Sequence, residues 1–280
     1  MKTVDGEKRG DHQNVARAAL VIETLAGAKE RGMRLTDVVD ATGLGTATIH
    51  RLLSGLVAHG FIDHDRNNSR YFVGLRMVGW AAAATQRYGL APFVDAGLES
   101  LCAQTGDTVY FSLLSGLDSV CVDRREGSYP IRTLTLSVGD RRPLGIGAGS
   151  LALLAFQDDT FIQSVLSEQE ERRLKFGIET DFLRDEIGEI RKSGFALNEG
   201  RLIAGMSGVA APIRKSDGTA VAAISVAAIT KRLSGARLKA TIDALLSEAA
   251  RIERVAGAVL DAPFAKRFTA RPSAQVEREA

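Results

Sequence analysis

The sequence is poor in the residues that build disulfide frameworks, zinc clusters and nucleophile–histidine pairs. It has two cysteines, Cys102 and Cys121, without CxxC spacing. Neither a disulfide framework nor a cysteine-based zinc cluster is therefore expected, and the thiols are expected to be reduced. All four histidines lie at or before His64, so the rest of the chain has no imidazole to act as a catalytic base.

Metal-ligand clusters are also scarce. His59 and His64 have Asp63 and Asp65 close by in the sequence, but no second group of ligand residues completes a coordination shell. We therefore expect neither a metal nor a cofactor.

An excess of one charge and a long apolar run are both missing. The formal net charge is +2, so any site for nucleic acid must be local rather than a property of the whole surface. The longest apolar run, residues 220–229, is far shorter than the ~20 residues of a membrane span. The first residues are polar and charged, unlike a secretory signal. We expect a cytoplasmic protein with no membrane partner.

The N-terminal part has the pattern of a winged helix-turn-helix. Three helical stretches are expected, over residues 15–25, from Leu35 to Gly43, and from Gly45–Thr46 to Gly60. Two short β-rich runs follow, Phe61–Asp63 and Tyr71–Val73, joined by a polar turn. Three helices closed by a hairpin predict a winged helix-turn-helix.

The remainder predicts an α/β (α+β) domain. Strands are expected at 108–114, 119–123, Ile131–Val138, 195–197, 206–213 and 220–228, with helices among them and a long helix over 236–259. The predicted organisation is a flexible N-terminus over 1–13, the winged helix-turn-helix over 14–74, a linker helix over 75–90, a second domain over 91–262 and a flexible tail over 263–280.

The third helix has one apolar stripe and one polar face. The stripe contains Ile49, Leu52, Leu53, Leu56 and Val57, and the other face carries Thr46, Ala47, Thr48, His50, Arg51 and Ser54. Small residues at the start of a recognition helix allow close approach to a base edge, while His50 and Arg51 can hydrogen-bond bases or phosphate. Arg70 at the wing and Arg17 on the first helix are candidate phosphate contacts. A plain solvated face remains the alternative.

A glycine-rich stretch, RRPLGIGAGSLALLAF over residues 141–156, raises the question of a nucleotide site. Its spacing is GxGxG rather than GxGxxG, and Gly149-Ser150-Leu151 lacks the lysine of a P-loop. A helix that starts near Gly147 still offers free N–H groups and a positive dipole end, which suit a carboxylate. A simple packing turn is the alternative.

Residues 34–65, RLTDVVDATGLGTATIHRLLSGLVAHGFIDHD, resemble the helix-turn-helix of IclR-type transcription regulators, whose pattern is "TGL…T-[VI]-HRLL…L…GF". The matching residues are Thr42, Gly43, Leu44, Thr48, Ile49, His50, Arg51, Leu52, Leu53, Leu56, Gly60 and Phe61. The chain departs at Gly45, where the family usually has proline, and at Thr46, where it has a basic residue. Further motifs extend the resemblance from about residue 14 to residue 259.

The resemblance implies a GAF-like second domain that binds small organic acids at the glycine loop, with Ile146, Gly147, Ala148 and Gly149. Matching the family's pocket residues gives Asn198, Gly208, Ser225 and Ala227, where the family commonly has Asp, Cys, Ser and Ser. These changes remove a negative charge and make room, which favours a bulkier carboxylate, aromatic acids included. Leu134, Leu136 and Ile146 are candidates for an apolar wall. The family's signature Glu is Arg201 here.

The sequence therefore predicts a sequence-specific DNA-binding transcription regulator controlled by a small carboxylate. The resemblance further implies a homodimer or a dimer of dimers, which would read a pseudo-palindromic double-stranded operator. One alternative is an enzyme that acts on a small carboxylate and carries an accessory winged helix. Another is a winged helix used for protein contacts alone. Activation and repression are equally compatible with the sequence.

Overall fold

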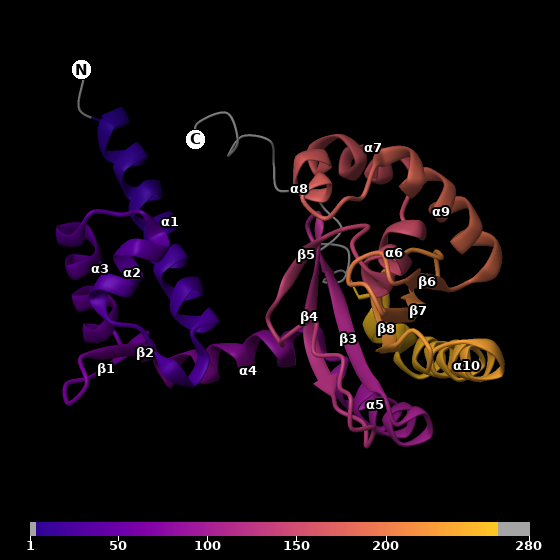
Figure 1. Ribbon diagram of the computed structural model, residues 1–280. Helices are drawn as coiled ribbons and strands as arrows, with labels where there is room; N and C mark the ends of the chain where they lie inside the picture. The colour runs from indigo at the N-terminus through magenta and orange to yellow at the C-terminus, as the bar shows by residue number, and fades with distance from the viewer. Residues whose placement is uncertain (1–3, 263–280) are drawn as a thin grey trace. The chain divides into compact units, whose positions relative to one another are not determined.

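The computed structural model describes the backbone of residues 4–262 and the side chains of residues 13–84 and 89–262. It forms two compact units that divide between Arg87 and Tyr88 (Figure 1). The tail predicted to be flexible, 263–280, lies outside the described residues. Among those residues, no helix combines the length and the apolar character that a membrane span requires.

The first unit is a winged helix-turn-helix, as predicted. Its elements are α1 (Val4–Gly27), the short 3-10 helix η1 (Lys29–Arg31), α2 (Leu35–Thr42), α3 (Thr46–Ala58), β1 (Ile62–Asp65) and β2 (Arg70–Val73), and α4 (Arg76–Tyr88) follows. Of the segment predicted to be flexible, residues 1–13, the structure describes the backbone from Val4 onward, where α1 begins. That stretch has no proline, so its polar composition does not prevent the helix from continuing in the N-terminal direction.

The turn between α2 and α3 is set by a glycine. Gly43 has φ +69°, and its N–H donates to the Val39 carbonyl at 2.9 Å, which closes the C-terminal end of α2. α2 begins after Arg34, whose backbone N–H donates to Asp37 Oδ2 at 2.9 Å. One apolar cluster unites the three helices and β1: Val21, Leu25, Val38, Ile49, Leu53, Leu56 and Ile62.

The wing joins the core through a close backbone approach at Gly74. A Cβ atom at this position would lie 2.4 Å from the Gly60 carbonyl oxygen and 2.9 Å from the Phe61 carbonyl carbon. The Gly74 N–H also donates to the Phe61 carbonyl at 2.8 Å. The end of β2 can therefore pass this turn only because residue 74 has no side chain.

Gly74→Ala is expected to lower the stability of the first unit by about 1–3 kcal/mol, because the new methyl group must push two backbone segments apart. The matched control is Gly79→Ala in α4, where a Cβ meets open space and helix propensity predicts a gain of about 0.5–1 kcal/mol. Thermal unfolding followed by the fluorescence of Trp80, the single tryptophan, measures both. An unchanged midpoint for Gly74→Ala would contradict the steric argument.

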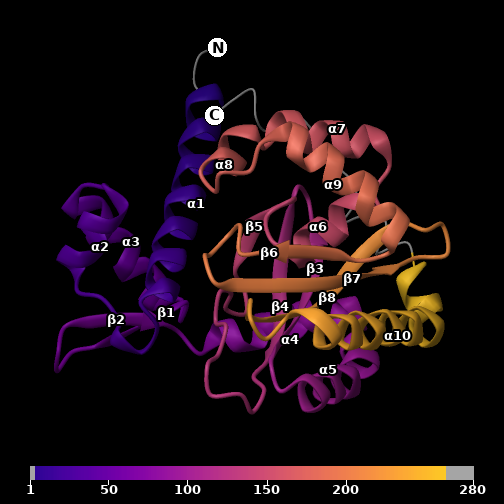
Figure 2. The same cartoon turned by 45° about the vertical axis from the view of Figure 1, so that its right-hand side comes forward.

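The second unit is a six-stranded antiparallel sheet between two helical layers (Figure 2). The strand order is β5-β4-β3-β8-β7-β6. The elements are α5 (Ala91–Thr105), β3 (Thr108–Ser115), β4 (Asp118–Arg125), β5 (Arg141–Pro143), α6 (Ala148–Ala155), α7 (Asp159–Glu168), α8 (Glu170–Leu174), α9 (Thr180–Ser193), β6 (Ala196–Glu199), β7 (Met206–Arg214), β8 (Ala220–Ile229) and α10 (Gly235–Leu260).

Alternation along the strands decides which residues face which layer. On β3, Val109, Phe111 and Leu113 join the cluster formed with α5 and α10. On β8, Ile224 and Val226 do the same, whereas Ala223 packs in the cluster with α6, α7 and α9. The residues between these apolar positions are small or polar. They lie at the end of the sheet face where α6 begins.

One predicted strand is absent, because Ile131–Val138 is an irregular segment between β4 and β5. Side chains take the backbone carbonyls that a neighbouring strand would otherwise bind. Arg142 Nη2 donates to the Thr135 carbonyl at 2.6 Å, and Arg124 Nη1 donates to the Leu136 carbonyl at 3.0 Å. The Tyr110 hydroxyl donates to the Thr133 carbonyl. The segment is therefore held as a fixed wall beside the sheet.

Candidate functional site

The face of α3 that the sequence predicted to be polar is open to solvent. Ile49, Leu53 and Leu56 are buried in the first unit. Five of the predicted DNA-contacting residues are exposed and one, Thr48, is half-buried; the exposed ones are Thr46, Ala47, His50, Arg51 and Ser54. The first turns of α3 therefore present short side chains with one histidine and one arginine, as a major-groove helix requires.

The charge around this face is suited to an anionic partner. Residues 41–62 contain no aspartate or glutamate, and Arg51 is the single lysine or arginine of α3. Acidic side chains beside a recognition helix would repel phosphate, so their absence keeps the approach open. The face is a local site on a nearly neutral chain.

Arg70 is not free at the wing as predicted. Its Nη1 donates to the carbonyls of Arg31 (3.1 Å) and Gly32 (3.0 Å), so the side chain ties β2 to the connection between α1 and α2. Arg66, which the sequence reading did not single out, is exposed in the turn between β1 and β2. It is a further candidate phosphate contact at the wing, beside Arg70. Arg17 is half-buried on α1.

His59 and His64, near the wing, lie beside aromatic rings rather than in a group of metal-binding side chains. The His64 ring stacks on Tyr71, with 4.2 Å between centroids and 8° between planes, and His59 lies 6.4 Å from the Phe61 ring. Within the described part of the chain, no group of three or more histidine, cysteine, aspartate or glutamate side chains is arranged to hold a metal ion.

The second candidate site is a cavity in the second unit, between the sheet and the N-terminal end of α6. Nine of the ten predicted effector-binding residues line it: Leu136, Ile146, Gly147, Ala148, Gly149, Asn198, Gly208, Ser225 and Ala227. The tenth, Leu134, is not among the lining residues and is 50% exposed, because the neighbouring Thr133 and Thr135 turn inward instead. Leu202, Ile203 and Met206 add an apolar edge.

The glycine loop is a rigid turn into α6, held by a serine. Gly145 has φ +97° and Gly147 has φ +84°. The Gly145 N–H donates to Ser150 Oγ at 3.0 Å, and the same hydroxyl donates to the Pro143 carbonyl at 3.0 Å. The first backbone bond within α6 runs from Leu151 N–H to the Gly147 carbonyl. The earlier N–H groups of the first turn are left to point towards the cavity end.

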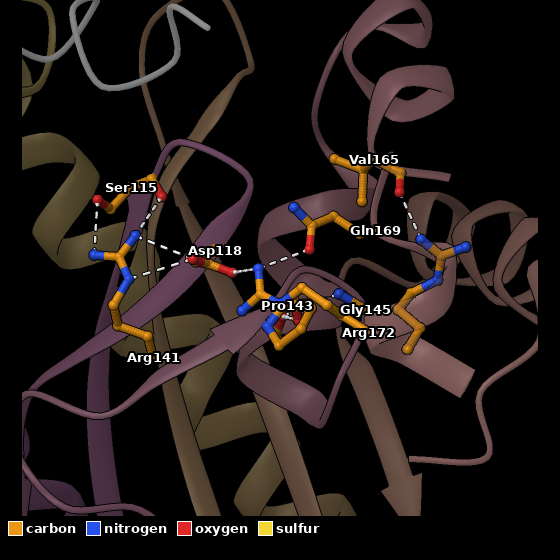
Figure 3. A network of polar contacts seen from close by, with 10 residues as sticks. Ser115, Asp118, Arg141, Pro143, Gly145, Val165, Gln169 and Arg172 are labelled. Atoms are coloured by element: carbon orange, nitrogen blue, oxygen red, sulfur yellow. Dashed lines mark hydrogen bonds and ion pairs between the residues drawn. The ribbon is translucent and has the colours of Figure 1, made fainter. Parts of the chain in front are cut away.

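An ion-pair network fixes the outside of the same loop (Figure 3). Asp118, whose side chain is 14% exposed, accepts from Arg141 at 3.1 Å and from Arg172 at 2.9 Å. Arg141 also donates to the Ser115 carbonyl, and Arg172 donates to Gln169 Oε1 at 2.7 Å. Strand β5, which leads into the glycine loop, is thereby clamped to the β3–β4 hairpin and to α8.

The sequence reading missed Arg142, which has a different role from its neighbour Arg141. Arg142 lines the cavity, and it is the single residue with a formal charge among the described residues that do so. Its Nη1 lies 3.4 Å from the place that a Cβ of Gly147 would occupy. Burial lowers the pKa of the Arg142 guanidinium, yet an arginine stays charged at neutral pH. Arg142 reaches the cavity wall because β5 pairs with β4 in the sheet. No local sequence motif marks this position.

The three pocket positions that depart from the family pattern form one row across the sheet. Asn198 on β6 pairs with Gly208 on β7, and Gly208 pairs with Ala227 on β8. A Cβ at Gly208 would lie 3.6 Å from Ala148 Cβ, so a side chain there would fill space at the start of α6. The departures therefore act on one region of the cavity wall.

Cys121 on β4 is buried, and it is the cysteine to consider as a nucleophile under the enzyme alternative. Burial, with a contribution from Asp140, raises the pKa of the Cys121 thiol to about 11. The sulfur is therefore protonated at neutral pH and is a poor nucleophile.

Comparison with known proteins agrees with this architecture. The family model for the C-terminal domain of bacterial IclR transcriptional regulators matches residues 82–254, and the IclR helix-turn-helix model matches residues 14–66. The HTH-type transcriptional regulator BhcR of Paracoccus denitrificans is 30% identical over 247 residues, which cover 88% of this chain and 87% of that protein.

Solved structures share the fold. The IclR regulator of Alicyclobacillus acidocaldarius superposes with a TM-score of 0.74 at 24% identity and covers 88% of this chain and 99% of its own. An IclR homologue from Microbacterium hydrocarbonoxydans, complexed with 4-hydroxybenzoate, gives a TM-score of 0.70 at 21% identity, with 86% and 98% covered. The chain therefore belongs to the IclR family, and it is a DNA-binding transcription regulator rather than an enzyme.

Proposed function

We propose that this regulator reads its operator with the exposed face of α3, and that a small organic acid in the cavity of the second unit changes its affinity for DNA. The observation that carries the proposal is the charge of the cavity. Its wall contains the first turn of α6 and the guanidinium of Arg142, and none of the described lining residues is acidic. A helix N-terminus beside a cation is a site for an anion.

On the DNA side, Thr46, Ala47 and Thr48 enter the major groove first, with His50, Arg51 and Ser54 along the same face. Arg66 at the wing and Arg17 on α1 contact phosphates. Leu75, Val78 and Trp80 are all more than half exposed around the start of α4, which supports self-association of the chain through this segment. A symmetric assembly reads a pseudo-palindromic operator, with half-sites separated by turns of the double helix.

On the effector side, the size and shape of the cavity favour a compact acid. Its volume is about 70 Å³, on a scale where one water needs about 10–15 Å³. The small residues Gly208 and Ala227 leave room beside α6, which supports acids with a ring or a branched chain. The 4-hydroxybenzoate complex of the Microbacterium hydrocarbonoxydans homologue supports an aromatic acid as one member of this class.

The acid acts on DNA binding only if its affinity differs between the DNA-competent and DNA-incompetent arrangements of the protein. The coupling is reciprocal, so DNA shifts the affinity for the acid by the same factor. An acid that releases the protein from DNA and an acid that strengthens its binding to DNA are both consistent with this scheme.

Fluorescence anisotropy on a labelled duplex from the regulator's own upstream region tests the proposal. We expect binding well above a scrambled duplex at physiological salt. From a panel of aliphatic and aromatic carboxylates, we expect at least one acid to change the Kd by about fivefold or more, the lower end of typical allosteric coupling. DNA binding that no acid alters, at concentrations up to the millimolar range, would contradict the proposed control.

A further inference from the structure

The start of α4 is attached to the C-terminal end of α3 by one arginine. Arg76 Nη1 donates to the carbonyl of His59, the residue that ends α3, at 2.6 Å. The stem of the same side chain passes over the next residue, since a Cβ at Gly60 would lie 3.8 Å from Arg76 Cβ and Cδ. A cation at the carbonyl end of a helix is stabilised by the hydrogen bond and by the helix dipole. Arg76 is therefore a C-terminal cap of α3 that α4 supplies.

Two aromatic rings extend this attachment. The rings of Phe61, directly after the end of α3, and Trp80 on α4 lie 4.8 Å apart between centroids, at 59°. The guanidinium carbon of Arg76 lies 5.2 Å from the centre of the Phe61 ring and 5.9 Å from that of Trp80. Arg76 and Trp80 are four residues apart, so they lie on one face of α4, a turn apart. We refer to Phe61, Arg76 and Trp80 as the α3–α4 cluster.

The α3–α4 cluster lies at the surface and is separate from the apolar core of the first unit. Arg76 is exposed, Trp80 is 52% exposed and Phe61 is half-buried. Of the three, only Phe61 packs against the buried apolar cluster that unites α1, α2, α3 and β1. The winged helix therefore has a core without Arg76 and Trp80. What these two side chains fix is the direction in which α4 leaves the end of α3.

This direction matters because α3 and α4 have different tasks in the proposed function. α3 reads a half-site, and the exposed apolar residues around the start of α4 join two copies of the chain. In a symmetric pair, the distance between the two reading helices then depends on the angle between α3 and α4 in each copy. Adding one base pair between the half-sites moves them apart by about 3.4 Å and turns them by about a tenth of a helical turn.

We propose that Arg76 is a positioning residue that sets the half-site spacing accepted by this regulator, because it fixes α4 against the end of α3. The inference rests on the proposed function, since it takes α3 as the reading helix and the start of α4 as the region of self-association. It adds a side chain that determines specificity without contacting DNA. A residue that contacts DNA changes the affinity at every spacing, whereas Arg76 changes how the affinity depends on spacing.

A series of duplexes with altered spacing tests this proposal. Footprinting on the duplex from the regulator's own upstream region locates the two half-sites, and one or two base pairs are then inserted or removed between them. Anisotropy titrations of the full chain are expected to show the wild type losing about tenfold in affinity at the first altered spacing. Arg76→Gln is expected to bind the native spacing about two- to fivefold more weakly and to vary little across the series.

Trp80 is the single tryptophan, so its fluorescence reports on the α3–α4 cluster directly. Arg76→Gln and Phe61→Leu each remove one member, and both are expected to make Trp80 easier to quench with acrylamide and to flatten the spacing profile. Phe61→Tyr keeps the ring and should behave as the wild type does. Arg66→Gln removes an exposed charge at the wing, outside the cluster. This charge-matched control should lower the affinity by one factor at all spacings.

The outcomes distinguish this inference from the proposed function. Flattened profiles for Arg76→Gln and Phe61→Leu, with a wild-type profile for Phe61→Tyr, support the inference. A profile for Arg76→Gln as steep as that of the wild type, or a wild-type profile that is already flat, overturns it and leaves the proposed function standing.

A loss by one factor at all spacings in Arg76→Gln, with a slope of log Kd against log salt reduced by about one unit, identifies Arg76 as a phosphate contact and also overturns the inference. A wild type that binds the operator no better than a scrambled duplex removes the proposed reading by α3, and the positioning role of Arg76 with it.

Discussion

Arg51→Ala is expected to weaken binding to the operator by about tenfold to a hundredfold, because one good side-chain contact to a base contributes about 1–3 kcal/mol of discrimination. Arg51 is exposed on α3, and no acidic residue occurs between positions 41 and 62. The replacement removes the single formal charge of that helix. Anisotropy titrations at several salt concentrations measure the effect, and the slope of log Kd against log salt is expected to fall by about one unit if a phosphate is also lost.

Arg254→Ala is the charge-matched control, since Arg254 is exposed on α10 in the second unit and its loss changes net charge equally. It should leave the Kd within about twofold of the wild type. Arg66→Ala should weaken operator and scrambled duplexes alike, as expected of a phosphate contact. If Arg51→Ala bound the operator as tightly as the wild type, the assignment of the reading face to α3 would be wrong, and the winged helix would be better explained as a surface for protein contacts.

Arg173→Met is expected to lower the free energy of unfolding of the second unit by about 2–4 kcal/mol. Arg173 is fully buried, with 0% exposure. Its Nη1 donates to the Val165 carbonyl at 2.5 Å, and its Nη2 donates to the Leu166 carbonyl at 2.8 Å and to Thr180 Oγ1 at 3.0 Å. The two carbonyls belong to the last turns of α7. The Val165 carbonyl also accepts from the Gln169 N–H at 3.2 Å, whereas the end of the helix leaves the Leu166 carbonyl without a following helical N–H.

Methionine fills much of the same volume but cannot donate, so the Leu166 carbonyl loses its side-chain partner and the Val165 carbonyl loses one of its two donors. The loss of these hydrogen bonds is partly offset, because methionine carries no charge that must be buried. The cost of burying the charge is seen in the pKa of the Arg173 guanidinium, which burial lowers. Differential scanning calorimetry should show the transition of the second unit shifted down by about 4–16 °C.

Arg172→Met is the neighbouring control for this prediction. The Arg172 side chain is 45% exposed and pairs with Asp118, so its replacement is expected to cost less than about 1 kcal/mol. Equal effects of the two substitutions would show that the buried hydrogen bonds of Arg173 contribute no more than a surface ion pair.

Local patterns in the sequence were enough to predict the two-part architecture and the exposed polar face of α3. Apolar residues at helical spacing predict which stripe of α3 is buried. The same periodicity places the polar residues on the opposite face. The glycine loop was likewise assigned to the start of a helix beside a ligand site, because glycines at 145 and 147 and a following apolar run are local features. Both predictions depend on residues that are close together in the chain.

The cavity wall was decided by tertiary structure alone. Asn198, Gly208 and Ala227 become one row only when β6, β7 and β8 pair, and residues 131–138 are rich in strand-forming types yet form a loop. Their carbonyls are bound by Tyr110, Arg124 and Arg142, and these donors lie on other strands.

The hydrogen-bond partners of the arginines were also decided by tertiary structure. Sequence gives the number and the charge of these side chains, but which acceptor each guanidinium reaches depends on segments distant in the chain. Arg70 is bound to a loop 38 residues away, while Arg142 lines the cavity. The sequence by itself determined the fold class and the exposed polar face of α3, because periodicity encodes burial. Only the packed structure determined the chemistry of the cavity, because that chemistry is assembled across strands.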